Sequence, residues 1–343
     1  MNVPTAPSWV SPSDKKGGMD NVVTDLRIPA TVITGFLGAG KTTLLNRLLR
    51  NQAGRKIAVI VNEFGEVGID GQLIFDDGNE QLIEFNNGCL CCTVRGDLIE
   101  TLERIRERAP DLDAIMIETT GLADPAPVAS TFFVSEEVKS AARLDAFITV
   151  IDAVNFERSL DENEEAREQL SFADIVLVNK IDLVSEEDLR GIENRIRRLN
   201  PLAKTYRTSQ ADVDPSLVIG TNAFQLAAKL EVDPLFLDEH PHEHDASIGS
   251  IVLREQRPID MNRFMAWISG LLQVQGGTIL RSKGVFNAMG FNERVLFQSV
   301  RMLTTINRLD AWGEAARTTE YVVIGRNLDC GMLEEGFFAC VRC

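Results

Sequence analysis

The stretch from Gly35 to Thr42, GFLGAGKT, constrains the fold more than any other part of the chain. It follows an apolar, β-branched run at 30–34 and precedes a segment in which leucines recur at helical spacing, so the order is strand, glycine loop, helix. Glycines before a helix N-terminus let backbone N–H groups close around phosphate oxygens. The stretch therefore predicts a P-loop and a site for a nucleoside triphosphate.

The residues expected to hold the phosphates follow one another along this loop. Lys41 is placed to reach the outer phosphates and so to support catalysis, and the Thr42 hydroxyl is placed to ligate Mg²⁺. The full set of nucleotide contacts predicted here is Gly35, Leu37, Gly38, Ala39, Gly40, Lys41, Thr42 and Thr43.

Carboxylates in two further segments are candidates for the catalytic machinery. An apolar run ends in Glu118 and soon reaches Gly121, the pattern of a Walker B strand followed by a second switch. Glu118 can act on Mg²⁺ through water or orient the attacking water, and the Gly121 amide can meet the γ-phosphate. An earlier loop carries Glu63, Glu66 and Asp70, each of which either reaches the metal or is a solvated loop carboxylate.

The base is predicted from Asn179, Lys180 and Asp182, an N-K-x-D motif at the end of another apolar run. A carboxylate there can accept hydrogen bonds from N1–H and the 2-amino group of guanine. Adenine lacks that donor pair and would leave a buried carboxylate unsatisfied, so GTP is favoured over ATP. Thr208 and Ser209, after the next short strand, can supply a second base contact.

Three of the six cysteines fall within four positions, at Cys89, Cys91 and Cys92. In an extended stretch the first two point to one side, and a turn at Cys92 can bring the third sulfur to meet them. Three thiolates form an open zinc-type site, because a fourth position is left for water, a carboxylate or an incoming ligand. The alternative is that they are three small buried hydrophobic residues.

All three histidines, His240, His242 and His244, lie in one acidic tract. Imidazoles and carboxylates in a flexible linker suit loose capture of a metal, so these histidines are candidate accessory ligands. A solvated linker with no metal function is the alternative.

Size and charge limit the classes of function. With 343 residues, 44% of them hydrophobic, the chain can form one large domain and a smaller one. Its net charge of −16 leaves no general basic surface for nucleic acid or anionic lipid. No apolar run reaches about 18 residues, and no signal peptide is indicated, so we expect a cytoplasmic protein without a membrane partner.

The pattern of elements predicts an α/β fold, in which a doubly wound, mainly parallel sheet precedes a smaller α+β domain. The expected segments are a disordered tail at 1–27, a P-loop domain at 28–230, an acidic and histidine-bearing linker at 231–246, the α+β domain at 247–328 and a C-terminal tail at 329–343. Near the C-terminus, Cys330, Cys340 and Cys343 are irregularly spaced, which favours free thiols over a second metal site.

Taken together, the motifs at 35–43, 62–66, 88–92, 118–125 and 179–182 resemble those of the CobW family of metallochaperone GTPases, over roughly residues 28–328. The resemblance implies a slow, metal-stimulated GTPase of the SIMIBI type that binds GTP, GDP and Mg²⁺. It implies Zn²⁺ or Co²⁺ at the three clustered cysteines and a ferredoxin-like C-terminal domain. The implied partner is a client metalloprotein or an enzyme of cobalamin synthesis, and a nucleotide-dependent homodimer is a further option.

Two other classes of function use the same motifs. One is a P-loop kinase or other transferase, against which the guanine motif and the absence of a recognisable acceptor site weigh. The other is a metal-sensing interaction protein that binds GTP and hydrolyses it only incidentally. No residue of the chain names a client, so the sequence does not separate a chaperone from a sensor.

Overall fold

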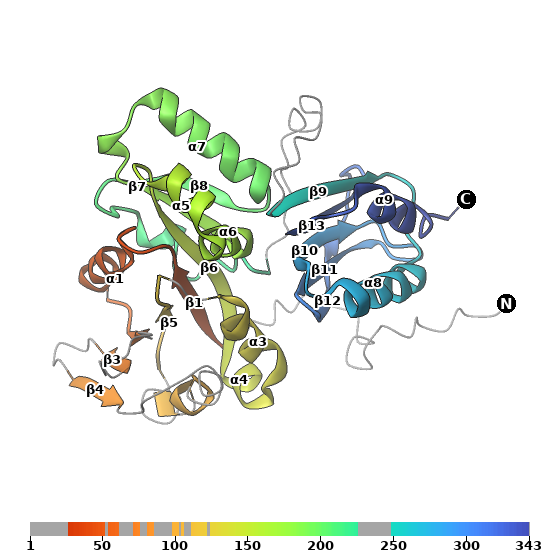
Figure 1. Cartoon of the computed structure of the whole chain (residues 1–343). Helices are drawn as coiled ribbons and strands as arrows, with labels where there is room; N and C mark the ends of the chain where they lie inside the picture. The colour runs from red at the N-terminus through yellow and green to blue at the C-terminus, as the bar shows by residue number, and fades with distance from the viewer. Residues whose placement is uncertain are drawn as a thin grey trace. The chain divides into compact units, whose positions relative to one another are not determined.

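The computed structural model divides the chain into two compact units (Figure 1). The described residues are 27–51, 54–61, 98–102, 104–105, 111–121, 124–225 and 248–342, together with the backbone of two strands at 71–75 and 81–85. One unit takes residues 27–250 and 324–327, and the other takes 251–323 and 328–343. Within the described ranges, no helix is long and apolar enough to cross a membrane.

The first unit is built on an eight-stranded sheet in the order β4-β3-β2-β5-β1-β6-β7-β8. Its strands are β1 (Ile28–Thr34), β2 (Ile57–Val61), β3 (Gly71–Phe75), β4 (Gln81–Phe85), β5 (Ala114–Glu118), β6 (Ala142–Asp152), β7 (Ile175–Asn179) and β8 (Lys204–Arg207). From β2 to β8 every neighbouring pair is parallel, whereas β3 and β4 add an antiparallel extension. The predicted mainly parallel sheet is confirmed.

Helices cover both faces of this sheet, as a doubly wound fold requires. They are α1 (Lys41–Arg50), α3 (Ala126–Val134), α4 (Glu136–Ala141), α5 (Phe156–Glu162), α6 (Glu164–Phe172) and α7 (Glu186–Leu199), with short 3₁₀ turns at Ile181–Leu183 and Pro215–Leu217. Along β7, Ile175 and Leu177 share a core with the leucines of α1, while Val176 and Val178 share another with α5, α6 and α7. Burial on both faces explains why such strands read as continuous apolar runs.

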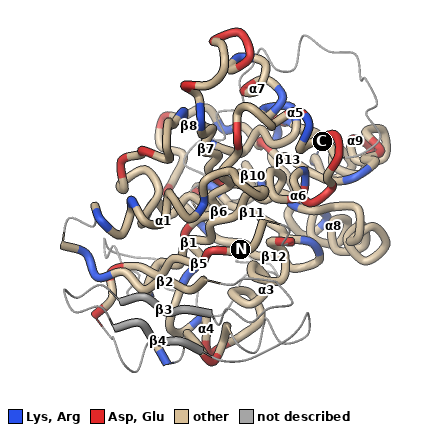
Figure 2. The backbone as a smooth tube through the Cα atoms, turned by 60° about the vertical axis from the view of Figure 1, so that its left-hand side comes forward, with Lys and Arg blue, Asp and Glu red and all other residues tan. Residues whose placement is uncertain are grey.

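Helix α7 begins just after the predicted base motif, which lies at the carboxyl end of β7. The Ser185 hydroxyl accepts from the Asp188 backbone N–H, and the Asp188 carboxylate accepts from the Ser185 backbone N–H, which is a capping box. Acidic residues fill the first turn, and Arg197 and Arg198 occupy the last, which matches the helix dipole (Figure 2). The cap fixes the start of the helix just after the 3₁₀ turn that carries Asp182.

The second unit has a five-stranded antiparallel sheet in the order β12-β11-β10-β13-β9. Its elements are β9 (Ile248–Glu255), α8 (Met261–Gln275), β10 (Ile279–Phe286), β11 (Glu293–Val300), β12 (Leu303–Ala311), β13 (Thr319–Arg326) and α9 (Cys330–Phe338). Because β13 lies between β9 and β10, the chain forms the split β-α-β arrangement of ferredoxin-like folds, extended by β11 and β12. Phe264 is fully buried among Phe286, Phe297 and Tyr321, with ring centroids 4.5 to 5.3 Å from its own.

The C-terminal residues do not form the tail that we expected from 329 onward. Asp329 caps α9 by accepting from the Met332 backbone N–H, and Leu333 and Phe337 are buried in the core of the second unit. The sequence does carry a signal for this helix, a capping aspartate followed by apolar residues at helical spacing. The expected tail at 1–27 (except Arg27) and the linker at 231–246 lie outside the described residues, and the other boundaries stay predictions.

Candidate nucleotide site

The loop between β1 and α1 passes so close to the neighbouring strands that two of its positions require glycine. Gly35 has φ of 138°, and a Cβ atom there would lie 2.1 Å from the Val150 carbonyl oxygen. Gly40 has φ of 111°, and its Cβ would lie 2.5 Å from the Asn179 side-chain nitrogen. The glycines therefore hold the loop against the ends of β6 and β7, with the first turn of α1 directly behind it.

Lys41 points back into the loop. Its ammonium donates to the carbonyl oxygen of Gly35 at 2.7 Å and to that of Phe36 at 3.3 Å. Burial lowers the pKa of Lys41, and the negative charge of Glu118 partly offsets this effect. The lysine thus places a cation against the backbone of the loop, where it can meet phosphate oxygens.

The predicted Mg²⁺ residue and the predicted Walker B carboxylate meet. The Thr42 hydroxyl donates to Oε1 of Glu118 at 3.0 Å, and the Glu118 side chain is buried. Glu118 pairs in register with Ile33 of β1 and Val61 of β2, so three parallel strands end around it. Hydroxyl and carboxylate oxygens are the ligands that Mg²⁺ prefers, so these two residues fit the predicted metal.

Gly121 follows β5 and lies against the P-loop. A Cβ atom there would be 2.8 Å from the Leu37 backbone nitrogen, so only glycine fits. Gln169 of α6, which is fully buried, donates from Nε2 to the Gly121 carbonyl oxygen at 3.1 Å. Gln169 is not predictable from the sequence, because nothing in its own segment marks it and its partner lies 48 residues away.

Asn179 joins the phosphate loop to the segment expected to contact the base. Its Nδ2 donates to the Ala39 carbonyl oxygen at 2.9 Å. Its Oδ1 accepts from the Ala211 backbone N–H at 2.8 Å and from the Thr208 hydroxyl at 3.2 Å. Asn179 is buried and uses both ends of its amide, so its predicted place in the nucleotide site has a clear structural basis.

Lys180 adopts the left-handed conformation with φ of 63°, and its ammonium lies 2.7 Å from Oδ2 of Asp152. Burial acts to raise the pKa of Asp152, but hydrogen bonds from Lys180, Asn155 and the Val154 backbone N–H together hold it below its usual value. Asp152 was a second missed residue. Its place at the carboxyl end of a parallel strand, where ligands of such sheets bind, was the available signal.

Asp182 lies on the 3₁₀ turn after Lys180, and the residue is exposed. The Ser209 hydroxyl donates to Oδ1 of Asp182. The structure therefore brings together the loop after β8 and the N-K-x-D motif, and a second base contact at Thr208 and Ser209 stays a prediction.

The predicted metal ligands other than Thr42 and Glu118 lie outside the described residues. They are Cys89, Cys91, Cys92, Glu63, Glu66, Asp70, His240, His242 and His244. In the part of the chain that the structure does describe, no three His, Cys, Asp or Glu side chains are grouped so that they can hold a metal ion.

The C-terminal cysteines behave as free thiols where they are described. Cys340 is buried and donates to the Gly336 carbonyl oxygen at 3.2 Å, and burial together with the charge of Asp260 raises its pKa to about 11. Burial likewise raises the pKa of Cys330. Both therefore stay protonated near neutral pH when no metal is bound.

A glycine loop enclosing a buried lysine, a carboxylate at the end of β5 and an N-K-x-D motif tied to both loops define the class of P-loop GTPases. The chain belongs to the CobW family. Residues 29–207 match the family described as "CobW/HypB/UreG, nucleotide-binding domain", and residues 248–341 match the "Cobalamin synthesis protein cobW C-terminal domain". The resemblance seen in the motifs is confirmed.

Similar proteins match this chain in sequence and in structure over most of its length. The zinc chaperone YjiA of Escherichia coli is 35% identical over 306 residues, covering 88% of this chain and 95% of that protein. The zinc-regulated GTPase metalloprotein activator 1 of Schizosaccharomyces pombe is 34% identical over 341 residues, covering 88% and 83%. The crystal structure of Zn(II)-bound YjiA GTPase has a TM-score of 0.70 at 31% identity, over 92% of this chain and 99% of that one. A Zn(II)-bound triple mutant of YjiA, in which one glutamate and two cysteines are replaced by alanine, has a TM-score of 0.72 at 32% identity, over the same shares.

Proposed function

We propose that this protein is a GTP-hydrolysing metallochaperone, which binds zinc or cobalt and uses GTP turnover to control its delivery to a client protein. The observation that carries the proposal is the hydrogen bond from Thr42 to Glu118, which joins the P-loop to the strand that leads into the second switch. Relatives named as zinc chaperones and as a zinc-regulated activator support the metal part of the proposal.

Hydrolysis requires water to attack the γ-phosphate while negative charge moves toward the leaving diphosphate. The Lys41 ammonium, enclosed by the loop, is placed to stabilise that charge. Thr42 and Glu118 would hold Mg²⁺, which when bound supplies further charge neutralisation. In its alternative role, Glu118 accepts a hydrogen bond from the attacking water; in either case the Gly121 amide donates to the γ-phosphate.

Selection of guanine rests on Asp182. Its carboxylate accepts from N1–H and the 2-amino group of the base, while Ser209 keeps the carboxylate in place by donating to Oδ1. Adenine would offer no donor pair to this carboxylate, so it would forgo hydrogen bonds to a charged group that contribute about 1.5 to 3 kcal/mol each. GTP and GDP are therefore the proposed nucleotides.

The metal site proposed for this protein is Cys89, Cys91 and Cys92. In the chain these cysteines lie between 63–70 and 118–121, the two segments expected to rearrange when the γ-phosphate is lost. A metal bound there would have different affinities in the GTP and GDP states, and by reciprocity it would change nucleotide affinity by the same factor. Coupling of this kind is typically about 5- to 150-fold.

The test is a competition titration of Zn²⁺ and Co²⁺ against a chromophoric chelator, with GDP and with a non-hydrolysable GTP analogue. We expect the intact protein to show different metal affinities in the two nucleotide states. A variant with Cys89, Cys91 and Cys92 all changed to serine should lose one bound metal per chain. The number of metal ions per chain is measured because zinc can also bind elsewhere: the triple mutant of YjiA, which lacks two cysteines, is itself Zn(II)-bound.

The matched control is Cys330→Ser, which removes a thiol of raised pKa in the second unit and should change nothing. Equal metal affinity in both nucleotide states would reject the coupling. Unchanged stoichiometry in the triple-serine variant would reject the cysteine site. Transfer of phosphate to an acceptor instead of release as inorganic phosphate would favour a kinase.

Further parts of the proposal concern ligands and partners. Glu63, Glu66 and Asp70 are proposed to approach the metals from the first switch, and the three histidines are proposed as accessory ligands. A cytoplasmic location and a nucleotide-dependent homodimer are also proposed.

A further inference from the structure

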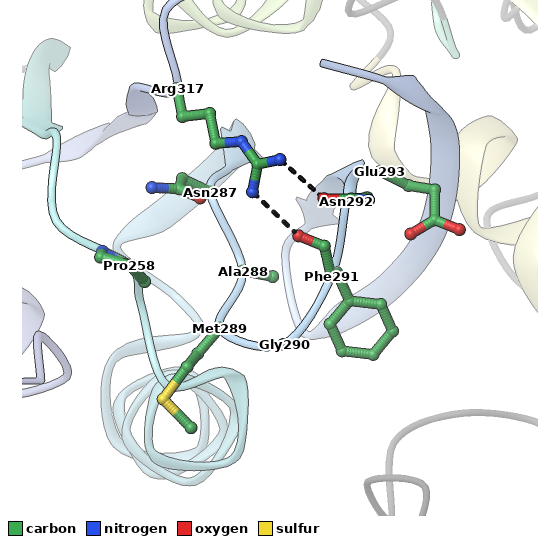
Figure 3. Close-up of a pocket in the computed structure, with 9 residues that line it drawn as sticks. All are labelled: Pro258, Asn287, Ala288, Met289, Gly290, Phe291, Asn292, Glu293 and Arg317. Carbon is green, nitrogen blue, oxygen red and sulfur yellow. Dashed lines mark hydrogen bonds between the residues drawn. The ribbon is translucent and has the colours of Figure 1, made fainter. Parts of the chain in front are cut away.

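The second unit has a surface pocket that takes no part in the nucleotide site. A cavity of about 530 Å³ opens at the loop between β10 and β11. Arg317 lies on one side of it, and Met289 and Phe291 lie on the other (Figure 3). This volume falls within the range of about 300 to 1,000 Å³ that is usual for ligand sites.

The pocket loop is held from several sides. The Met289 backbone N–H donates to the Ile259 carbonyl oxygen at 2.9 Å, and the Trp312 backbone N–H donates to that of Asn292 at 3.1 Å. Between them, Gly290 takes a left-handed conformation with φ of 83°. A loop fixed in this way is already ordered before a ligand arrives, which lowers the entropic cost of binding.

Arg317 is oriented by this loop. Its Nη2 donates to the Asn292 side-chain oxygen at 2.7 Å, and its Nη1 donates to the Phe291 carbonyl oxygen at 3.4 Å. Both acceptors are neutral, so the guanidinium charge is not compensated by them. Glu293 also lines the pocket, but its carboxylate points away from Arg317 (Figure 3).

Two more arginines contact the apolar side of the same pocket. Arg308 lies over the ring of Phe291, 4.8 Å from the centroid, and Nη1 of Arg342 lies 3.4 Å from the Met289 sulfur. Within the described ranges, neither these two arginines nor Arg317 forms an ion pair. Arginines elsewhere commonly do: examples are Arg195 with Asp161, Arg207 with Glu186 and Arg254 with Glu320. A chain of net charge −16 thus places three uncompensated arginines around one cavity.

We propose that this pocket is a docking site for an acidic peptide segment of a partner protein. Arg317 takes a carboxylate in the paired geometry that suits guanidinium, and Met289 and Phe291 receive an adjacent apolar side chain. Arg308 and Arg342 add positive charge at the rim. The overall negative charge of the chain does not prevent this, because ionic screening limits repulsion to about 8 Å at physiological salt.

A peptide fits the pocket better than a small free acid does. Sites for small molecules bury roughly 70 to 90% of their ligand. Arg317 is exposed and Met289 is 40% exposed, so a small acid would keep much of its surface in water. An extended segment can place one carboxylate at Arg317 while its neighbours cover the open side.

The experiment measures binding of labelled hexapeptides, drawn from a pool rich in Asp, Glu, Leu and Phe, to the full-length protein with GDP. The same pool with Asn and Gln in place of Asp and Glu is the peptide control. We expect the acidic pool to bind, the amide pool to bind at least tenfold more weakly, and affinity to fall as salt is raised. Arg317→Gln should weaken binding about tenfold or more, and Arg317→Lys should weaken it less because the charge remains.

The matched variant is Arg301→Gln. Arg301 donates to the Gly277 carbonyl oxygen at the opposite end of β11, so its loss should leave peptide affinity unchanged. Equal weakening by the two glutamine variants would overturn the site. Failure of the acidic pool to bind at millimolar concentration would also overturn the site. Selective binding of citrate or succinate through Arg317, without binding of any peptide, would overturn the peptide as the ligand.

Discussion

The nucleotide site and the pocket of the second unit place their cations in different surroundings. In the nucleotide site, Lys41 is buried near the charge of Glu118, and Lys180 pairs with Asp152. At the pocket, Arg317 is exposed, donates to two neutral acceptors and forms no ion pair among the described residues. A buried or ion-paired cation exchanges internal contacts for ligand contacts when its ligand arrives, which suits a site that must release its ligand in each cycle. An exposed cation without an ion pair gives up chiefly water, which suits a surface that recognises a partner.

The largest expected effect tests whether the second unit is a stable platform for its pocket. Phe337→Ala removes a fully buried ring of α9, which stacks 6.1 Å from Tyr321. It should lower the free energy of unfolding of this unit by about 3 to 5 kcal/mol. The neighbouring change Phe338→Ala, at a ring that is 41% exposed, should cost less than about 1 kcal/mol. Chemical denaturation followed by circular dichroism measures both, and equal costs would mean that α9 is not part of the core.

A smaller effect is expected from Asp182→Asn, which tests whether the first site reads guanine. The amide presents a donor where the base also donates, so GTP affinity should fall roughly 10- to 100-fold. Xanthosine triphosphate should bind better than before, because its 2-oxo group accepts where guanine donates. Calorimetry with GTP, ATP and xanthosine triphosphate measures this.

The control for this change is Asp310→Asn, at a fully exposed carboxylate of β12, which should leave nucleotide affinity unchanged. Equal affinities for ATP and GTP in the unmodified protein would contradict the guanine assignment.

The smallest expected effect comes from Gln169→Leu. This change tests whether a buried amide supports catalysis in the first unit but not in the second. Loss of the hydrogen bond to Gly121 frees the segment that is proposed to contact the γ-phosphate, so kcat should fall about tenfold with little change in KM. Gln298→Leu makes the same change at a buried glutamine of β11 in the second unit and should leave kcat unchanged. Phosphate release measured against GTP concentration separates kcat from KM. A rise in KM alone would show that Gln169 affects binding and not the reaction.

The sequence was informative where neighbouring residues form one local structure. The phosphate loop, the carboxylate of Glu118 and the motif from Asn179 to Asp182 each lie within a few residues of a strand end, so parallel pairing brings them to one edge of the sheet. The same logic predicted Ser209, whose strand β8 is the edge neighbour of β7.

Residues that act across long separations were not predictable in this way. Gln169 reaches Gly121 from a helix on the face of the sheet, and no pattern within α6 distinguishes it from a core residue. The pocket of the second unit takes Pro258, Arg317 and a hairpin loop from three places in the chain, and only folding brings them together. Helix α9 differs from these cases, because its cap and its apolar spacing are local signals that the sequence does contain.

Asn179 has a consequence for how the two ends of a nucleotide are bound. Because one side chain holds the carbonyl of Ala39 and the backbone N–H of Ala211, the phosphate loop and the loop proposed to contact the base are fixed relative to each other. A ligand that spans both loops binds its second end with the advantage of a chelate. A free nucleoside or a free pyrophosphate contacts only one of the two loops, so each should bind more weakly than the intact nucleotide.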